Sequence, residues 1–332
     1  MIRVREEKEW EDEENPLPQK NETYLENKEN MDEISKKNLG IFIEKIIDGK
    51  KEPLSQLLAV LEARGFIVSK GGNDFYIFDL SAKYRDVDMG ITDLPYIEKI
   101  FKKNNIGYLL DSKIVLNSDF KTEQLMDFFL PPHGGFGAGG DRISLPLGWR
   151  DFYERKRGIV IPLSDLDPLI SHLVRAISLI NISTDSSCAG RGSFKSENKR
   201  WPNIGFKNFY DALWFKIIFN NLVNPAIIPQ SDWKITHGKL IIKNSLDDIV
   251  GMYYEIQKVA AFLYGNRMVL KDLKQCVVKK LKRDENFLKM IHDINSDKNG
   301  SKSYENKIFE FFNTQYMQCL SEKLDLNVGE LK

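Results

Sequence analysis

The sequence predicts an α+β fold with two mixed subdomains, which a glycine-rich segment joins and an acidic arm precedes. Several stretches repeat apolar residues at helical spacing, and short apolar stretches bounded by glycine lie between them. Residues 130–142 concentrate glycine and proline, which makes them a natural boundary. We therefore divide the chain into an acidic flexible arm (1–38), a first α+β domain (39–129), a Gly-rich junction (130–157) and a second α+β domain with a helical C-terminal part (158–332).

In the first domain the expected elements follow from apolar spacing and from turn residues. Leu54 to Ala63 has strong helical spacing, and Gly65 is a suitable stop because glycine adopts the left-handed conformation easily. The expected elements are helix 41–47, helix 54–63, strand 66–70, an apolar segment 74–80, strand 86–91, helix 93–103, hairpin 108–116 and helix 122–129.

In the second domain the expected elements again alternate. Residues 233–243 predict a hairpin that turns at His237-Gly238, and Ser245, with Asp248 three residues on, is suited to cap the long helix that follows. The other expected elements are strand 158–162, an amphipathic helix 166–180, a loop over 181–189, strand 203–207, helix 209–222 and a helical tail from 270 that breaks at 295–301.

Charge is unevenly distributed along the chain. The formal net charge of all 332 residues is zero, but residues 1–34 hold twelve acidic and five basic side chains, a net charge of −7. The remainder therefore carries +7, and a mildly basic body favours partners that contain phosphate. The hydrophobic content of 42% is that of an ordinary soluble protein.

The cysteines and the hydropathy predict a cytoplasmic location. Cys188, Cys276 and Cys319 lie far apart without a CxxC pair, so we expect no disulfide framework and a reducing compartment. The N-terminus has no apolar core of the kind that a signal peptide requires. No apolar run approaches the roughly 18 residues of a membrane span, so we expect no membrane partner.

Two carboxylates provide the strongest chemical signal. Asp86 and Asp88 are two positions apart, so on the expected strand they project from the same face and can reach one divalent ion. They follow Gly71-Gly72 after thirteen intervening residues, 73 to 85. Glycines at a turn let backbone N–H groups approach a phosphate closely.

Residues 54–119 resemble the polymerase-β-like nucleotidyltransferase superfamily through this Gly-Gly turn and the Asp-x-Asp strand. The resemblance implies that Gly71 and Gly72, next to Lys70, cradle a nucleoside triphosphate. It implies that Asp86 and Asp88 hold Mg²⁺, which activates the attacking hydroxyl. It also implies a third carboxylate on a neighbouring strand, for which Asp119 is the candidate. The sequence has Asn73 where that family more often has Ser or a small residue, and the alternative is a solvated edge of a surface hairpin.

A second motif is the run from Ser183 to Arg191, which contains Ser-Ser-Cys-Ala-Gly-Arg. It is similar to the Ser-Ser-Cys-x-Gly-Arg signature of the methyltransferases of wybutosine synthesis, which implies methyl transfer to tRNA from S-adenosylmethionine. Small and hydroxyl residues before a glycine make a loop that can bind an anion, with Ser187, Cys188 and Gly190 in it and Arg191 as the cation. For Cys188, a structural thiol is the alternative to a reactive one.

Basic residues cluster twice. Residues 191–207 include Lys195 and Arg200 among aromatic side chains, as stacked single-stranded nucleic acid would require. Residues 271–283 hold six basic residues and one acid, which also describes a solvated helix face.

The functional prediction is a Mg²⁺-dependent nucleotidyltransferase that acts on an unknown acceptor, which the segment 183–207 would hold and which could be RNA. The competing interpretation is an RNA-binding or RNA-modifying module in which the aspartate pair has no catalytic role. A protein that binds a partner without catalysis is the third alternative.

Overall fold

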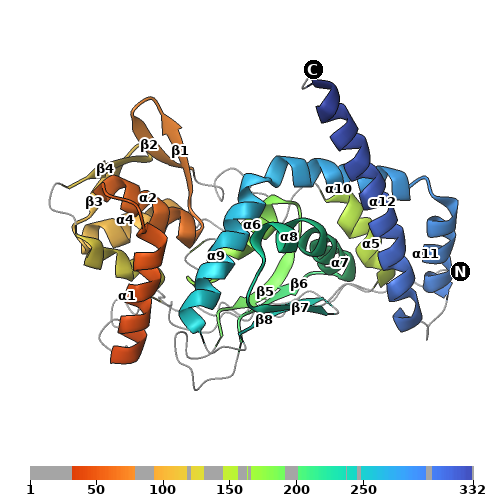
Figure 1. Cartoon of the computed structure of the whole chain (residues 1–332), viewed down its shortest axis with the longest axis horizontal. Helices are drawn as coiled ribbons and strands as arrows, with labels where there is room; N and C mark the ends of the chain where they lie inside the picture. Colours follow the sequence, from red (N-terminus) through yellow and green to blue (C-terminus); the bar gives the residue numbers. More distant parts are fainter. Residues whose placement is uncertain are drawn as a thin grey trace, which may run out of the picture.

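In this computed structural model of the chain, the described residues are 32–78, 93–117, 121–130, 145–155, 163, 166–190, 201–236, 238–244, 248–296 and 301–330. They form an α+β fold, as the sequence predicted, in which helices accompany two four-stranded antiparallel sheets. Figure 1 shows one sheet at one end of the molecule, and the other sheet beneath a layer of helices.

The described residues between 32 and 130, which we call the first part, contain the sheet β1-β2-β4-β3. Its elements are α1 (Glu33–Ile47), α2 (Pro53–Arg64), β1 (Ile67–Gly71), β2 (Asp74–Phe78), α4 (Asp93–Lys103), β3 (Gly107–Leu110), β4 (Lys113–Leu116) and the 3-10 helix η1 (Thr122–Phe129). The side chain of Asp32 caps α1 by accepting a hydrogen bond from the Ser35 amide. Residues 33–38 are therefore helical, and the prediction that the flexible arm extends to residue 38 is wrong.

This part repeats one arrangement that the sequence does not make evident. In each repeat a helix (α2 or α4) ends in a residue with positive φ, Gly65 at 96° or Asn105 at 50°, and a hairpin follows. The next residue is buried, and its amide donates to a carbonyl five residues back: Phe66 to Leu61, and Ile106 to Phe101. This is the Schellman pattern of a helix end. The two hairpins meet through β2 and β4, in which Tyr76 pairs with Lys113.

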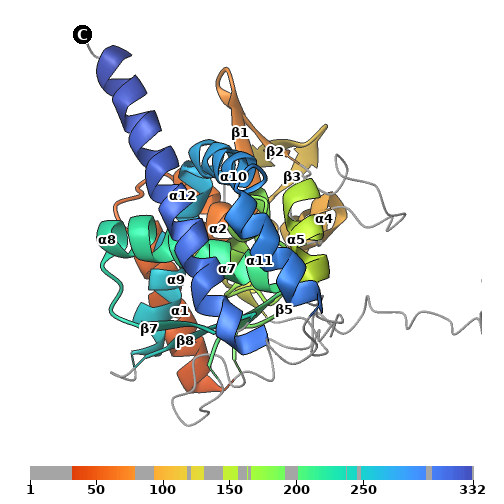
Figure 2. The same cartoon turned by 90° about the vertical axis from the view of Figure 1, so that its right-hand side faces the viewer.

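The described residues between 145 and 330, which we call the second part, contain the sheet β5-β6-β8-β7 and most of the helices (Figure 2). Its elements are α5 (Leu145–Glu154), α6 (Ser171–Leu179), β5 (Thr184–Cys188), β6 (Asn203–Phe206), α7 (Phe209–Ile218), the π-helical turn η3 (Phe219–Val223), α8 (Asn224–Ile227), β7 (Asp232–Thr236), β8 (Lys239–Lys243), α9 (Ile249–Gly265), α10 (Arg267–Leu281), α11 (Glu285–Ser296) and α12 (Ser301–Glu330). The hairpin predicted over 233–243 is confirmed. Among the described residues, no helix combines the length and the apolar character that crossing a membrane would demand.

Helix α6 corrects another prediction. It begins at Ser171 and not at residue 166, and each of its residues is buried, so it has no solvated face. It packs against α9, which crosses the centre of the molecule in Figure 1. The expected amphipathic helix is therefore a core helix.

Buried charged side chains fix the first part on the second. The guanidinium of Arg64 in α2 is buried and donates to the carbonyl oxygens of Phe128 (3.1 Å), Leu163 (2.6 Å) and Leu166 (3.2 Å). Arg64 in turn accepts a hydrogen bond at its carbonyl from the Ser171 hydroxyl of α6, at 2.6 Å. These bonds satisfy a buried cation from both parts, which favours one fixed arrangement of the two.

A disulfide joins Cys276 of α10 to Cys319 of α12, with their Cα atoms 6.1 Å apart. The prediction that the cysteines would form no disulfide is therefore wrong. The sequence could not show this pairing because 43 residues separate the two cysteines. Cys188 is free and half-buried.

Candidate nucleic-acid interface

The sheet β5-β6-β8-β7 has one apolar and one polar face. Opposite residues of antiparallel strands point to the same side. Ile204 lies opposite Leu240, and both are buried toward α7. The neighbouring positions on these strands point the other way. We call that side the polar face, and its members are Ser186, Cys188, Asn203, Gly205, Asp232, Lys234, Thr236, Lys239, Ile241 and Lys243.

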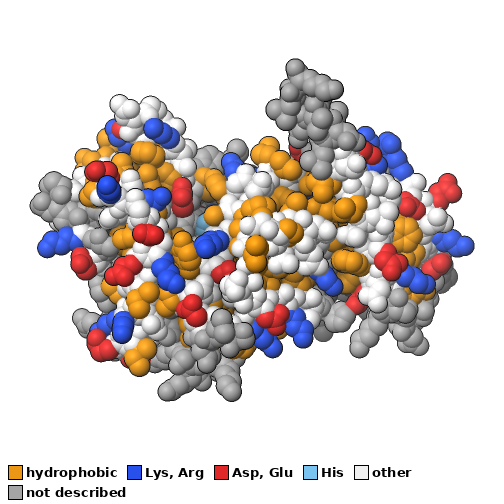
Figure 3. Space-filling model, in the orientation of Figure 1, with side chains coloured by type: hydrophobic (Ala, Val, Ile, Leu, Met, Phe, Trp, Pro, Cys, Tyr) orange, Lys and Arg blue, Asp and Glu red, His pale blue; other side chains and the backbone are white. Residues whose placement is uncertain are grey.

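Three lysines from the two strands β7 and β8 project from the polar face. Lys234 is exposed, and Lys239 and Lys243 are half-buried. Two carboxylates are on the same face: Asp232 lies opposite Lys243, and the Asp185 carboxylate lies over Gly205. Figure 3 shows basic side chains along the lower edge of the molecule, where these strands lie in Figure 1. The face therefore carries three cations against two carboxylates, and its lysines are at least partly accessible.

The Ser-Ser-Cys segment forms the edge of this sheet. Residues 184–188 are strand β5, paired with β6, so the loop expected over 181–189 is in fact largely a strand. The pairing register shifts between Thr184 and Ser186, which leaves Asp185 as an extra residue. A Cβ on Gly205 would lie 2.1 Å from the Asp185 carboxylate, so a larger residue here would displace the Asp185 side chain from this bulge. Ser186 and Cys188 thereby share the polar face with the lysines.

The backbone amides after β5 are already bonded within the protein. The Ala189 amide donates to the Asp167 carboxylate at 3.1 Å, and the Gly190 amide lies 3.4 Å from the Cys188 sulfur. The hydroxyl of Tyr253 donates to the Ala189 carbonyl. Burial raises the pKa of Asp167, while the Ala189 amide opposes that change. The amides of Ala189 and Gly190 are therefore engaged within the protein.

The remaining residues that were expected to bind the acceptor are close in sequence to the β5 edge of this sheet. Arg191, Lys195 and Arg200 lie outside the described residues, in the segment that connects β5 to β6. That segment leaves β5 after Cys188 and enters β6 at Asn203, which pair with each other. Ser187 and Gly190 are described, and Ser187 points to the side opposite Cys188 because it pairs with the buried Ile204.

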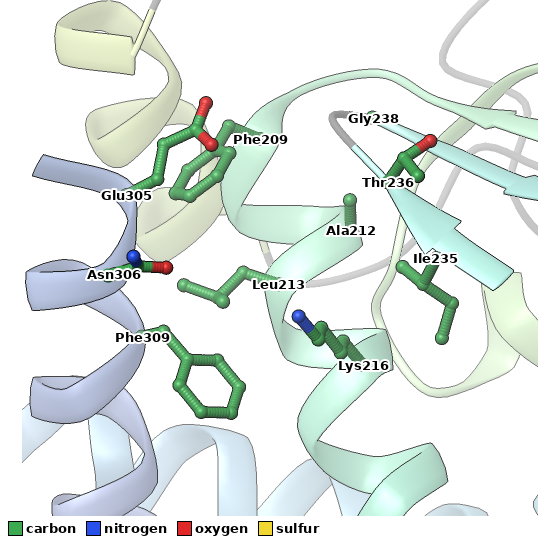
Figure 4. A pocket seen from close by; sticks show the side chains of 10 residues that line it. All are labelled: Phe209, Ala212, Leu213, Lys216, Ile235, Thr236, Gly238, Glu305, Asn306 and Phe309. Atoms are coloured by element: carbon green, nitrogen blue, oxygen red, sulfur yellow. The ribbon is translucent and has the colours of Figure 1, made fainter. Parts of the chain in front are cut away.

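A cavity of about 320 Å³ lies between α7, α12 and the end of the β7–β8 hairpin (Figure 4). Helix α7 forms its floor, with α12 on one side and the end of β7 on the other. Its apolar lining is Phe209, Ala212, Leu213, Ile235 and Phe309. Ile235 lies opposite the buried Leu240, so the cavity is on the α7 side of the sheet, and it borders the polar face only at the end of β7, where Thr236 lies opposite Lys239.

Polar groups on the rim give this cavity a specific chemistry. The Lys216 ammonium lies 5.1 Å from the centre of the Phe309 ring and points into the space between α7 and α12. Asn306 and Glu305 add an amide and a carboxylate from α12. An aromatic ring, a cation and hydrogen-bonding groups around an apolar floor are suited to a flat, polar-edged ligand such as a nucleobase.

The predicted catalytic carboxylates, Asp86, Asp88 and Asp119, lie outside the described residues. The residues on either side of them are described. Strand β2 leaves the sheet at Phe78, beside the start of β4, whereas β4 leaves the sheet at the opposite end.

The residues expected to bind the triphosphate form the tip of the β1–β2 hairpin. Gly71 pairs with Asp74, and Gly72 has a φ of 65°, which a tight turn requires. Both glycines and Lys70 are exposed, and a Cβ on Gly72 would meet no atom within 4 Å. The Lys70 ammonium lies 5.9 Å from the centre of the Phe75 ring. The described residues thus form no concave surface at this turn.

The second basic cluster, 271–283, is a largely solvated face from which Lys274 departs. Lys274 is buried, with its ammonium 2.5 Å from the Asn181 carbonyl oxygen and 3.9 Å from the Phe152 ring centre. Burial lowers its pKa to about 8, although the Asp211 carboxylate opposes the change. Lys280 pairs with Glu322 at 2.7 Å. Lys279, Lys282 and Arg283 are exposed, so the solvated-face interpretation holds for most of the cluster and fails for Lys274.

The lysines of the polar face were missed in the sequence analysis. Their signal was present, because Lys234 alternates with the apolar Trp233 and Ile235, and Lys239 and Lys243 alternate with Leu240 and Ile242. Such alternation places the lysines on one side of a hairpin. What the sequence lacked was the position of β6 and β5, which adds Asn203, Cys188 and Ser186 to the same side.

The comparisons with known proteins return nothing: no family model, no curated protein and no solved structure matches the chain.

Proposed function

We propose that the protein binds single-stranded nucleic acid, RNA or DNA, across the polar face of the sheet β5-β6-β8-β7. The single observation that carries this proposal is the projection of Lys234, Lys239 and Lys243 from one accessible face of two paired strands. Phosphate contacts by lysine provide the sequence-independent part of nucleic-acid affinity.

The spacing of the lysines favours a polymer over a single phosphate group. Lys239 and Lys243 are four residues apart on β8, which corresponds to roughly 13 Å along a strand. Lys234 lies on the neighbouring strand, opposite Ile241. One phosphate cannot contact all three ammonium groups, whereas a strand with a phosphate on every nucleotide can.

The cavity beside Thr236 favours a single strand over a duplex. Proteins read single strands by stacking unpaired bases on aromatic rings and by hydrogen bonds to the base edges. Phe309 and Phe209 supply aromatic surface in the cavity, and Asn306 supplies both a donor and an acceptor. Bases inside a duplex cannot enter such a cavity without unpairing.

The test measures binding of the full chain to labelled single-stranded RNA and DNA. Fluorescence anisotropy gives the affinity at several salt concentrations. Wild type is compared with the variant Lys234→Gln, Lys239→Gln, Lys243→Gln. For single strands the slope of log K against log salt changes by about 0.7 for each phosphate contact. We expect the triple variant to bind more weakly, with a slope that is smaller by roughly 2.

A matched control removes the same charge elsewhere. Lys37, Lys51 and Lys102 are exposed in the first part of the molecule, so Lys37→Gln, Lys51→Gln, Lys102→Gln should bind almost as wild type. Equal losses in the two triple variants would show that only the net charge matters. Absence of binding at low salt would reject the proposal outright.

Metal-dependent nucleotidyl transfer stays a separate prediction, which the sequence supports through Asp86, Asp88 and Asp119. The two functions are compatible, since a nucleotidyltransferase needs a site that holds its acceptor.

A further inference from the structure

Helices α10 and α12 bring together three side chains with metal-binding atoms. The ligand atoms of Cys276, Cys319 and Glu322 all lie within 4.8 Å of one another. Two sulfurs and one carboxylate oxygen, completed by a water molecule, match the donor set of a four-coordinate zinc site. While the two cysteines are joined as a disulfide, they offer no thiolate, and the thiolate is the form that binds a metal.

We propose that reduction of the Cys276–Cys319 disulfide turns this corner of the molecule into a binding site for a thiophilic divalent cation, with zinc as the expected ion. A dithiol reductant supplies two electrons and two protons and itself becomes a disulfide, and the protein gains two thiols. Binding of the cation then releases both thiol protons to solvent, because the ligands are thiolates.

The surrounding packing keeps the ligands close after reduction. Both helices bury apolar side chains independently of the disulfide, including Leu273 and Val277 of α10 and Phe312 of α12. The Cα atoms of the two cysteines are 6.1 Å apart. Two sulfurs on one tetrahedral zinc lie about 3.8 Å apart, because each Zn–S bond is about 2.3 Å. Rotation of the two cysteine side chains can provide this separation without movement of the helices.

The carboxylate is already oriented toward the cysteines. Cys276 and Lys280 are four residues apart on α10, and Cys319 and Glu322 are three apart on α12, so each pair shares a helix face. The Lys280 ammonium donates to Oε1 of Glu322 at 2.7 Å, which holds the carboxylate against α10. The other oxygen, Oε2, can then bind the metal, in the way that outer hydrogen bonds commonly fix metal ligands.

The donor set decides the kind of ion. Thiolates select zinc and related soft ions, whereas Mg²⁺ and Ca²⁺ prefer sites made of oxygen atoms. The proposed site is therefore distinct from a Mg²⁺ site at Asp86 and Asp88, and it does not depend on nucleic-acid binding.

For the test, the full chain is reduced with a phosphine, and the phosphine is then removed. Co²⁺ is added as a spectroscopic substitute for zinc, and its absorption is recorded. We expect one Co²⁺ per chain, an absorption band from thiolate-to-cobalt charge transfer, and loss of that band when zinc is added. Oxidised protein should give no band. Cys188→Ser is the matched control, because it removes the free cysteine and should leave the band unchanged.

Two variants examine the ligands. Cys276→Ser should abolish the band, and Glu322→Gln should raise the Kd for Co²⁺ by about tenfold or more. Glu322 is exposed, so its variant should fold even if Cys276→Ser does not. A band in oxidised protein, no band in reduced protein, or an unchanged Kd in Glu322→Gln would overturn the proposed site.

Discussion

The guanidinium of Arg175 in α6 lies 2.7 Å from the carboxylate of Asp93 in α4, and both side chains are 3% exposed. Asp93 also accepts a hydrogen bond from the Leu163 amide at 2.8 Å. This pair connects the first part of the molecule to the second, beside the Arg64 bonds. Removal of one partner from a buried ion pair leaves an uncompensated charge.

Asp93→Ala should therefore lower the free energy of unfolding by about 3–5 kcal/mol. Urea denaturation followed by circular dichroism measures this change. Glu154→Ala is the control, because it breaks the exposed pair with Arg150 and should cost less than about 1 kcal/mol. Similar costs for both variants would contradict the importance of the buried pair.

His172 should make the protein less stable in mild acid. Its ring is buried in α6, and Nδ1 lies 2.9 Å from Oε1 of Gln257. Burial lowers its pKa to about 4, and the Gln257 hydrogen bond opposes that change only in part. In the unfolded chain a histidine has a pKa of about 6.5, so between these values the unfolded state binds a proton that the folded state does not.

The free energy of unfolding should therefore fall as the pH decreases from 6.5 to 4, by up to roughly 3 kcal/mol from this residue alone. The measurement is urea denaturation at several pH values, compared between wild type and His172→Gln. The difference between the two curves isolates His172 from the carboxyl groups, and a pH-independent difference would contradict the prediction.

A change in the cavity between α7 and α12 should lower the affinity for single-stranded nucleic acid and leave the affinity for a duplex unchanged. Phe309→Leu removes the aromatic surface next to Lys216. Stacking of a base on an aromatic ring contributes about 1–3 kcal/mol, so the affinity for single-stranded RNA or DNA should fall by that amount. Anisotropy with single-stranded and duplex forms of one sequence measures this. An equal loss for the duplex would indicate that no base enters the cavity.

The predicted nucleotidyltransferase site can be examined without knowledge of its acceptor. Thermal unfolding is recorded with Mg²⁺ and each nucleoside triphosphate, for wild type and for Asp88→Ala. A ligand present at about 100 times its Kd adds roughly 2.7 kcal/mol to the free energy of unfolding. The prediction is a metal-dependent increase in Tm that the variant lacks. If no nucleotide changes the Tm of wild type, the aspartate pair has no such role.

The sequence by itself determined the features that depend on neighbouring residues. Helical spacing before Gly65 and the alternation around His237-Gly238 specify a helix end and a hairpin through local backbone preferences, and both are confirmed. The α+β class follows from such segments because each has its own periodicity.

Only the tertiary structure decided which charged and sulfur-containing side chains meet. Lys274 appeared to belong to a solvated cluster, but it is buried against Phe152. Cys276 and Cys319 are joined across 43 residues, and Ser186 shares a face with Lys239 through the intervening strand β6. Burial and pairing of this kind depend on contacts between distant segments, and local patterns in the chain carry no information about which distant segments come together.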